Sequence, residues 1–143
     1  MVDLILVERI LADIQANINS LKAADDITWD VYRQDIRNRR FVERTLHIII
    51  EGIIDVGQHI IADEGMREPE SYRDLFLVLA ENGVISRDNL PTYEKMAMFR
   101  NLIVHYYEKV DDELMFGIFR KNLPDALLFI AEIRSYLNSI RQF

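Results

Sequence analysis

The segment RTLHIIIEGIIDVGQHIIAD, residues 44–63, decides the fold, because its apolar side chains recur at the three- and four-residue steps of one helix face. Their density implies burial on more than one side. Gly52 and Gly57 each cost about 1 kcal/mol relative to alanine inside a helix, so we expect a neighbouring helix to approach closely there. The segment therefore predicts the longest helix of an all-α protein, over about residues 30–63, with a seam of Val42, Leu46, Ile49, Ile53, Val56 and Ile60.

The rest of the chain predicts further helices. Only three prolines and five glycines occur among 143 residues, and strand-like alternation is nearly absent. We expect one domain, residues 1–143, folded as an up-and-down helical bundle of about five helices. We expect a first helix with a seam from Leu4 to Leu21, and an N-cap for the long helix at Asp26, Thr28 or Asp30. After the long helix, we expect a helix from Ser71 to Gly83 and another over 86–109 with a kink or restart at Pro91. A short piece capped by Asp111 and Asp112 and a last helix over 124–140 should follow.

Composition excludes several classes of function. The absence of cysteine rules out thiolate chemistry and agrees with a reducing cytosol. The amino-terminal residues lack the pattern of a signal peptide, and the uninterrupted apolar runs are far shorter than a membrane span requires. The net charge of −7 argues against broad affinity for nucleic acid, although a local basic patch remains open. No glycine-rich phosphate loop occurs. We therefore expect a cytoplasmic protein with no cofactor and no membrane or DNA partner.

The segment FRNLIVHYYEKVD, residues 99–111, carries the candidate chemistry. On an ideal helix, Asn101 and His105 share one side at i, i+4 spacing, which allows the amide to fix the imidazole tautomer. Arg100 lies about 140° from His105, so the two diverge too far to grip one small group without a long reach of the arginine or a local distortion. A homodimer that packs this helix near its twofold axis would bring the arginine of one subunit to the histidine of the other.

Arginine and histidine without a metal cluster suit phosphate chemistry. A guanidinium binds phosphate oxygens in a bidentate fork, and a histidine exchanges protons near neutral pH. This pair could cleave RNA through its 2′-hydroxyl and could not cleave DNA by the same route. The spacing alone also fits an ordinary helix face whose histidine has a satisfied hydrogen bond, which is the commoner situation.

The pattern Arg-x4-His-x-Tyr in FRNLIVHYY resembles that of the HepT-like toxin family of the HEPN superfamily. The segments RTLHIIIEGIIDVGQHIIAD, SYRDLFLVLAENGVI, MAMFRNLIVHYYEKVD and IFRKNLPDALLFIAEI are similar to successive parts of that family, in the same order, over roughly residues 40–135. The resemblance implies a helical homodimer and a metal-independent endoribonuclease. It assigns Arg100 and His105 to a catalytic cleft at the dimer interface and Asn101 to the polar position after the arginine. It also implies that an MntA-type nucleotidyltransferase antitoxin silences the toxin by adenylylating Tyr107.

Other charged residues allow further interpretations. Arg33, Arg37, Arg40 and Arg44 would form one cationic stripe along a continuous helix, a plausible track for an RNA backbone unless nearby acids absorb these charges. His47 with Glu51, and His59 with Asp63, have metal-ligand spacing but lack further ligands, so surface ion pairs are expected instead. An alternative to catalysis is a helical dimer that serves as the binding subunit of a nucleotidyltransferase, with Arg100 and His105 in a structural network.

Overall fold

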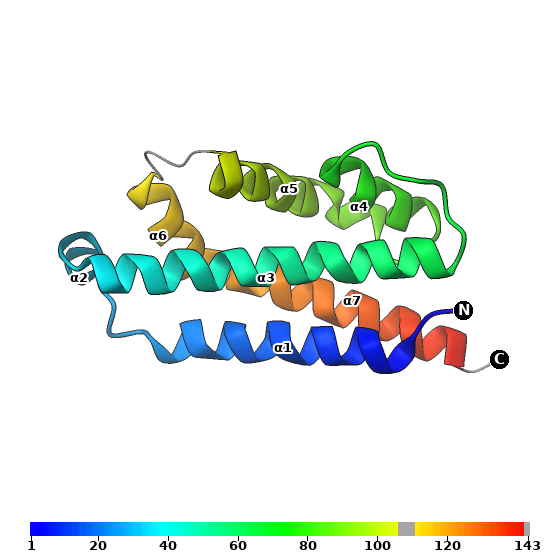
Figure 1. Ribbon diagram of the computed structural model, residues 1–143, viewed down its shortest axis with the longest axis horizontal. Helices are drawn as coiled ribbons and strands as arrows, with labels where there is room; N and C mark the ends of the chain where they lie inside the picture. Colours follow the sequence, from blue (N-terminus) through cyan, green and yellow to red (C-terminus); the bar gives the residue numbers. More distant parts are fainter. Residues whose placement is uncertain (106–110, 142–143) are drawn as a thin grey trace.

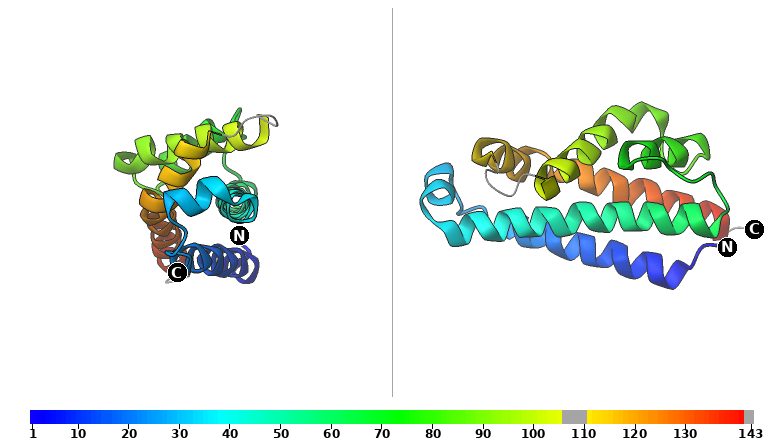
Figure 2. Two further views of the ribbon diagram at one scale, coloured as in Figure 1. Left: turned by 90° about the vertical axis from the view of Figure 1, so that its left-hand side faces the viewer. Right: turned by 45° about the horizontal axis from the view of Figure 1, so that its top comes forward.

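The computed structural model describes residues 1–105 and 111–141, and every regular element in that part of the chain is a helix (Figure 1). The long helices α1, α3, α5 and α7 run in alternating directions, which confirms the expected all-α up-and-down bundle (Figures 1 and 2). The described residues form more helices than expected: α1 (Leu4–Ala23), α2 (Trp29–Gln34), α3 (Ile36–Asp63), α4 (Tyr72–Glu81), the 3₁₀ turn η1 (Arg87–Asn89), α5 (Leu90–His105), α6 (Asp112–Lys121) and α7 (Leu123–Arg141).

Helix α3 is the centre of the bundle and contacts all six other α-helices in the described chain. The expected seam of this helix is buried along its whole length. The close approaches expected at its glycines are also present. A Cβ on Gly52 would lie 2.8 Å from Cγ1 of Ile14 on α1, and one on Gly57 would lie 2.7 Å from Cδ2 of Leu75 on α4. Both glycines therefore let a side chain of a neighbouring helix pack directly against the α3 backbone.

The prediction of one continuous helix over 30–63 is wrong at one point, because the helix is interrupted at Asp35. The backbone of Asp35 is extended, and its carboxylate accepts a hydrogen bond from the Arg37 amide, which makes it the N-cap of α3. The preceding turn, α2, is capped by Thr28 and held by aromatic packing. Trp29 and Tyr32 both contact Phe116 of α6, with ring centroids 5.5 Å apart in each pair. Tertiary packing thus turns the first residues of the expected helix toward α6.

Several of the other expected helix ends agree with the structure. Ser71 caps α4 by accepting a hydrogen bond from the Asp74 amide, and Gly83 follows the helix with a positive φ of 73°. Asp111 caps α6. The helix expected from Ser86 begins as the 3₁₀ turn η1, and the α-helix starts at Leu90, so the region of Pro91 is a restart. Its expected end at residue 109 lies outside the described residues.

One helix in the described chain, α3, is long and apolar enough to span a membrane by those measures alone. In the bundle, however, 56% of its most apolar window is buried against other helices. Figure 1 shows α3 between α1 on one side and α5 on the other, with α7 running beside it. Its hydropathy is therefore explained by its central position in the core.

Candidate functional site

Arg100 lies near the end of α5 and reaches between α3 and α4. Its Nε donates a hydrogen bond to Oε1 of Glu51 on α3, at 2.9 Å. Its guanidinium also stacks on the ring of Tyr72, the first residue of α4, with Cζ 4.3 Å from the ring centroid. The side chain is only 17% exposed. This recessed arginine, fixed by a carboxylate and an aromatic ring, is the core of the candidate site.

Glu51 lies close to two basic side chains, Arg100 and His47. The oxygen that accepts from Arg100 is also 3.3 Å from Nε2 of His47, one helical turn earlier. The expected ion pair between His47 and Glu51 is therefore present and is extended by Arg100. The adjoining Gly52 leaves room for Ile14 of α1 to pack against the α3 backbone, next to the residue that reaches toward α5.

Tyr72 is held in place by the capped start of α4. The loop before it is clamped by Arg67, whose guanidinium binds Asp74 at 2.8 Å and Glu81 at 3.0 Å. The hydrogen bonds from Arg67 hold the pKa of Asp74 at about 2 and also lower the pKa of Glu81. A charged network on the outer side of α4 thus fixes the aromatic face on which Arg100 lies.

The remaining residues of the expected motif are placed differently from Arg100. Asn101 is exposed and lines a shallow hollow with Tyr72, Gln58 and Leu75. His105 is the last residue of α5, but its side chain lies outside the described residues, as does all of Tyr107. The hydrogen bond expected between Asn101 and His105 therefore stays a prediction, as does the divergence of Arg100 from His105.

The expected arginine stripe is interrupted. Arg33 lies on α2, and Arg37, Arg40 and Arg44 lie on α3, so the break at Asp35 removes the common helix axis on which the stripe depended. All four side chains are exposed. Arg33 lies 3.6 Å from Asp30, and Arg40 lies 3.2 Å from Glu43, so local acids partly absorb the positive charge.

His59 does not pair with Asp63 as expected. Its Nε2 lies 3.4 Å from Asp55, four residues earlier. The Asp63 carboxylate instead accepts a hydrogen bond from the amide of Asp3, which ties the end of α3 to the start of α1. Within the described residues, no three histidine, aspartate or glutamate side chains come together as metal ligands.

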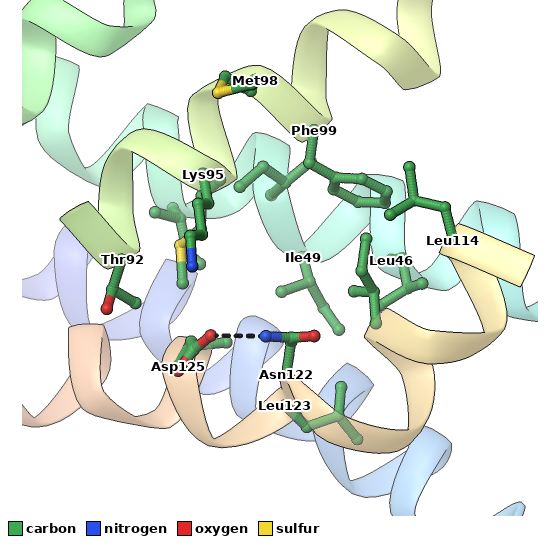
Figure 3. A pocket seen from close by; sticks show the side chains of 15 residues that line it. Leu46, Ile49, Thr92, Lys95, Met98, Phe99, Leu114, Asn122, Leu123 and Asp125 are labelled. Atoms are coloured by element: carbon green, nitrogen blue, oxygen red, sulfur yellow. Dashed lines mark hydrogen bonds between the residues drawn. The ribbon is translucent and has the colours of Figure 1, made fainter. Parts of the chain in front are cut away.

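A separate apolar cavity lies on the other side of α5, with a volume of about 380 Å³ (Figure 3). Phe99 and Leu46 form part of its wall, and Lys95 points into it from α5. The hydrogen bond between Asn122 and Asp125 lies at the opposite edge. None of its lining residues contacts Arg100 through an ion pair or ring stack, so the cavity and the arginine site use different faces of one helix.

Sequence reasoning missed two residues of the site. The i, i+4 spacing of His47 and Glu51 indicated an ion pair but gave no sign that Glu51 also binds Arg100, 49 positions away. Tyr72 carried no signal beyond its place next to the helix cap. Both contacts are long-range, and only the packing of α3, α4 and α5 brings them together.

The fold and site define an all-α bundle with a recessed arginine suited to binding an anion. The family described as "Ribonuclease HepT-like" matches residues 12–133. The chain therefore belongs to the HepT-like family of the HEPN superfamily.

Two curated relatives carry nuclease names. The mRNA nuclease HepT of Shewanella oneidensis is 29% identical over 104 residues, which are 73% of this chain and 78% of the relative. The tRNA nuclease HepT of Aphanizomenon flos-aquae is 24% identical over 140 residues, which are 96% of this chain and 94% of the relative.

Solved structures extend the similarity to nearly the whole fold. YutE, a cytosolic protein from Bacillus subtilis, superposes with a TM-score of 0.81 at 27% identity, over 96% of this chain and 92% of YutE. A tri-AMPylated HEPN toxin from Shewanella oneidensis, in complex with an MNT antitoxin, superposes with a TM-score of 0.80 at 26% identity, over 94% of this chain and 99% of the toxin chain.

Proposed function

We propose that this protein is an endoribonuclease and the toxin component of a two-gene toxin–antitoxin module. The observation that carries the proposal is the recessed Arg100, whose Nε is bound by Glu51 while its other N–H groups donate to no described residue. Such a guanidinium can present its terminal nitrogens to a phosphate. Family membership and the RNA-nuclease names of the relatives supply the substrate class. The cytosolic structural relative supports a cytoplasmic location.

The proposed reaction needs no metal ion. His105 accepts the proton of a 2′-hydroxyl, whose oxygen forms a bond to the adjacent phosphorus. The bond from phosphorus to the 5′-oxygen breaks, and that oxygen takes a proton from the imidazolium form of His105 as it leaves. Arg100 stabilises the charge that builds on the phosphoryl oxygens, and Asn101 positions the imidazole. The products are a 2′,3′-cyclic phosphate and a 5′-hydroxyl.

A homodimer would complete the site. On an ideal helix, Arg100 and His105 would differ by about 140°, and Arg100 is directed into its own subunit toward Glu51. Two copies packed about a twofold axis near the ends of α5 could place His105 of each chain against the open edge of the other's Arg100. The exposed arginines on α2 and α3 would then contact the RNA backbone outside the cleft.

Control by a partner enzyme is part of the proposal. An MntA-type nucleotidyltransferase would transfer AMP to the Tyr107 hydroxyl, which attacks the α-phosphorus of ATP and releases pyrophosphate. The added group is bulky and anionic, and beside the cleft it would exclude RNA by volume and by charge. The AMPylated Shewanella toxin bound to its MNT antitoxin supports this regulation.

A second candidate function is favoured by the ion pair between Arg100 and Glu51. If that pair is purely structural, the chain would be a non-catalytic helical dimer that serves as the binding subunit of a nucleotidyltransferase. His105 then contributes to stability or dimerisation rather than to catalysis.

The deciding experiment compares wild-type protein with His105→Ala and Arg100→Ala on bulk tRNA and a structured messenger RNA, in EDTA. Oligomeric mass is measured first, because loss of the dimer would mimic loss of catalysis. The proposal expects cleavage that leaves 2′,3′-cyclic phosphate ends and a fall of about 10²–10⁴-fold in His105→Ala with the mass unchanged. An unmodified wild type that cuts neither RNA would support the binding-subunit function.

A further inference from the structure

The contact between Arg100 and Glu51 is monodentate and uses only the Nε edge of the guanidinium. A guanidinium has five N–H donors, and four of them donate to none of the residues that the structure describes. The Tyr72 ring covers one face of the group, with Cζ 4.3 Å from the centroid. The carboxylate and the ring therefore fix the position and plane of the guanidinium without occupying its terminal nitrogens.

We propose that Glu51 is a positioning residue of the active site, an inference that rests on the proposed ribonuclease function. Glu51 holds Arg100 in the orientation that receives the phosphate, and Nε2 of His47 lies 3.3 Å from the same oxygen of Glu51. Glu51 does not touch the substrate. Its effect passes through Arg100, because a long arginine side chain that is free to rotate samples many orientations that cannot bind a phosphate.

Two features favour positioning over simple neutralisation. A carboxylate that only cancelled the charge of Arg100 would pair best with the two-nitrogen edge of the guanidinium, in the bidentate geometry that arginine and carboxylate prefer. Here it binds the Nε, the nitrogen that a phosphate needs least when it takes both terminal nitrogens. Glu51 also lies on α3, the most extensively packed helix, while Arg100 comes from α5. The fixed helix thus sets the position of a side chain carried by its neighbour.

The test compares cleavage by wild type, Glu51→Ala and Glu51→Gln, with Arg100→Ala as the reference. Glu94→Ala is the matched control, because it also removes an arginine–glutamate pair between helices, here Arg73 with Glu94 at 3.1 Å, and the two glutamates are similarly exposed. Thermal melts show whether each variant folds. We expect Glu51→Ala to lower kcat about 100-fold with little change in KM, because a displaced arginine fails in the transition state.

Glu51→Gln keeps an acceptor oxygen of the same reach, although the uncharged amide binds less strongly, so we expect its kcat to fall only about 10-fold. A second readout does not depend on activity. The side-chain Nε–H signal of Arg100 in ¹⁵N NMR, identified by its loss in Arg100→Lys, should be protected in wild type, weakened in Glu51→Gln and lost to exchange in Glu51→Ala.

The outcomes separate the two proposals. Loss of activity in Arg100→Ala together with wild-type kcat in Glu51→Ala or Glu51→Gln overturns the role of Glu51 and leaves the ribonuclease function intact. Higher activity in Glu51→Ala also overturns it, because the carboxylate would then be restraining Arg100. Full activity in Arg100→Ala overturns the proposed function itself. An equal loss of kcat in Glu94→Ala would show that removing any ion pair between α5 and a neighbouring helix has the same effect, which overturns the specific role of Glu51.

Discussion

The two glycines Gly57 and Gly117 should respond to alanine with opposite signs. Both lie inside helices, so each substitution gains about 1 kcal/mol of helix propensity. At Gly117 on α6 the added Cβ meets nothing within 4 Å, and the gain is kept. At Gly57 on α3 the Cβ lies 2.7 Å from Cδ2 of Leu75 and 3.2 Å from Cδ1 of Leu79. Both leucines are at most 1% exposed, so neither can move without displacing other core atoms.

Overpacking of this kind costs about 1–3 kcal/mol, which exceeds the gain in propensity. We therefore expect Gly57→Ala to lower the free energy of unfolding by about 1 kcal/mol and Gly117→Ala to raise it by about 1 kcal/mol. Urea denaturation followed by circular dichroism measures both values under the same conditions. The difference of about 2 kcal/mol is larger than the error of such extrapolations.

The cause can be isolated in a Leu75→Ala background, where the main clash is removed. There, Gly57→Ala should become neutral or stabilising, since only the propensity term and the looser contact with Leu79 remain. If Gly57→Ala proves as stabilising as Gly117→Ala in the wild-type background, the added methyl group meets no costly clash with Leu75, and the reasoning from the close packing of α4 on α3 is refuted.

Two further predictions concern polar networks away from the site. Glu132 on α7 accepts hydrogen bonds from the buried Tyr93 hydroxyl at 2.8 Å, from the amide of Ser86, which caps η1, and from the side chain of Asn89 in η1. Glu132→Ala should therefore cost about 3 kcal/mol in urea denaturation, whereas Glu132→Gln, which keeps an acceptor, should cost less. Asp74, whose folded pKa of about 2 lies below its ordinary 3.8, contributes stability that is present above pH 4 and is lost as the pH falls toward 2. Acid titrations of unfolding should therefore show a smaller loss of stability in Arg67→Ala than in wild type across that window. Identical curves would contradict the role of Arg67.

The periodic helices were predictable because their signals are local. The seam of α3, the cap at Ser71 and the end at Gly83 all lie within a few residues of the features they specify. The break at Asp35 was not predictable in this way. Every residue around it tolerates a helix, and the turn depends on the contacts of Trp29 and Tyr32 with Phe116, more than 80 positions later.

The candidate site also combines local features, which the sequence predicted, with long-range contacts, which it did not. The spacing of Arg100, Asn101 and His105 is a property of one helix, and the sequence predicted it. The partners of Arg100 come from two other helices, α3 and α4, and their identity depends on how these helices pack against α5. No local period carries such information, which is why Glu51 and Tyr72 emerged only from the structure.

Because α3 contacts every other α-helix of the described chain, its buried seam faces several partners at once, while Arg44 and Ile48 lie on its exposed side. A substitution along its seam must suit several partners at once, whereas α2 or α6 can change against fewer neighbours. Divergent relatives should therefore keep the volume of the α3 seam and vary most at the periphery. Glu51 is part of α3, so the orientation of Arg100 should persist among relatives even where the surfaces that bind RNA or a partner protein differ.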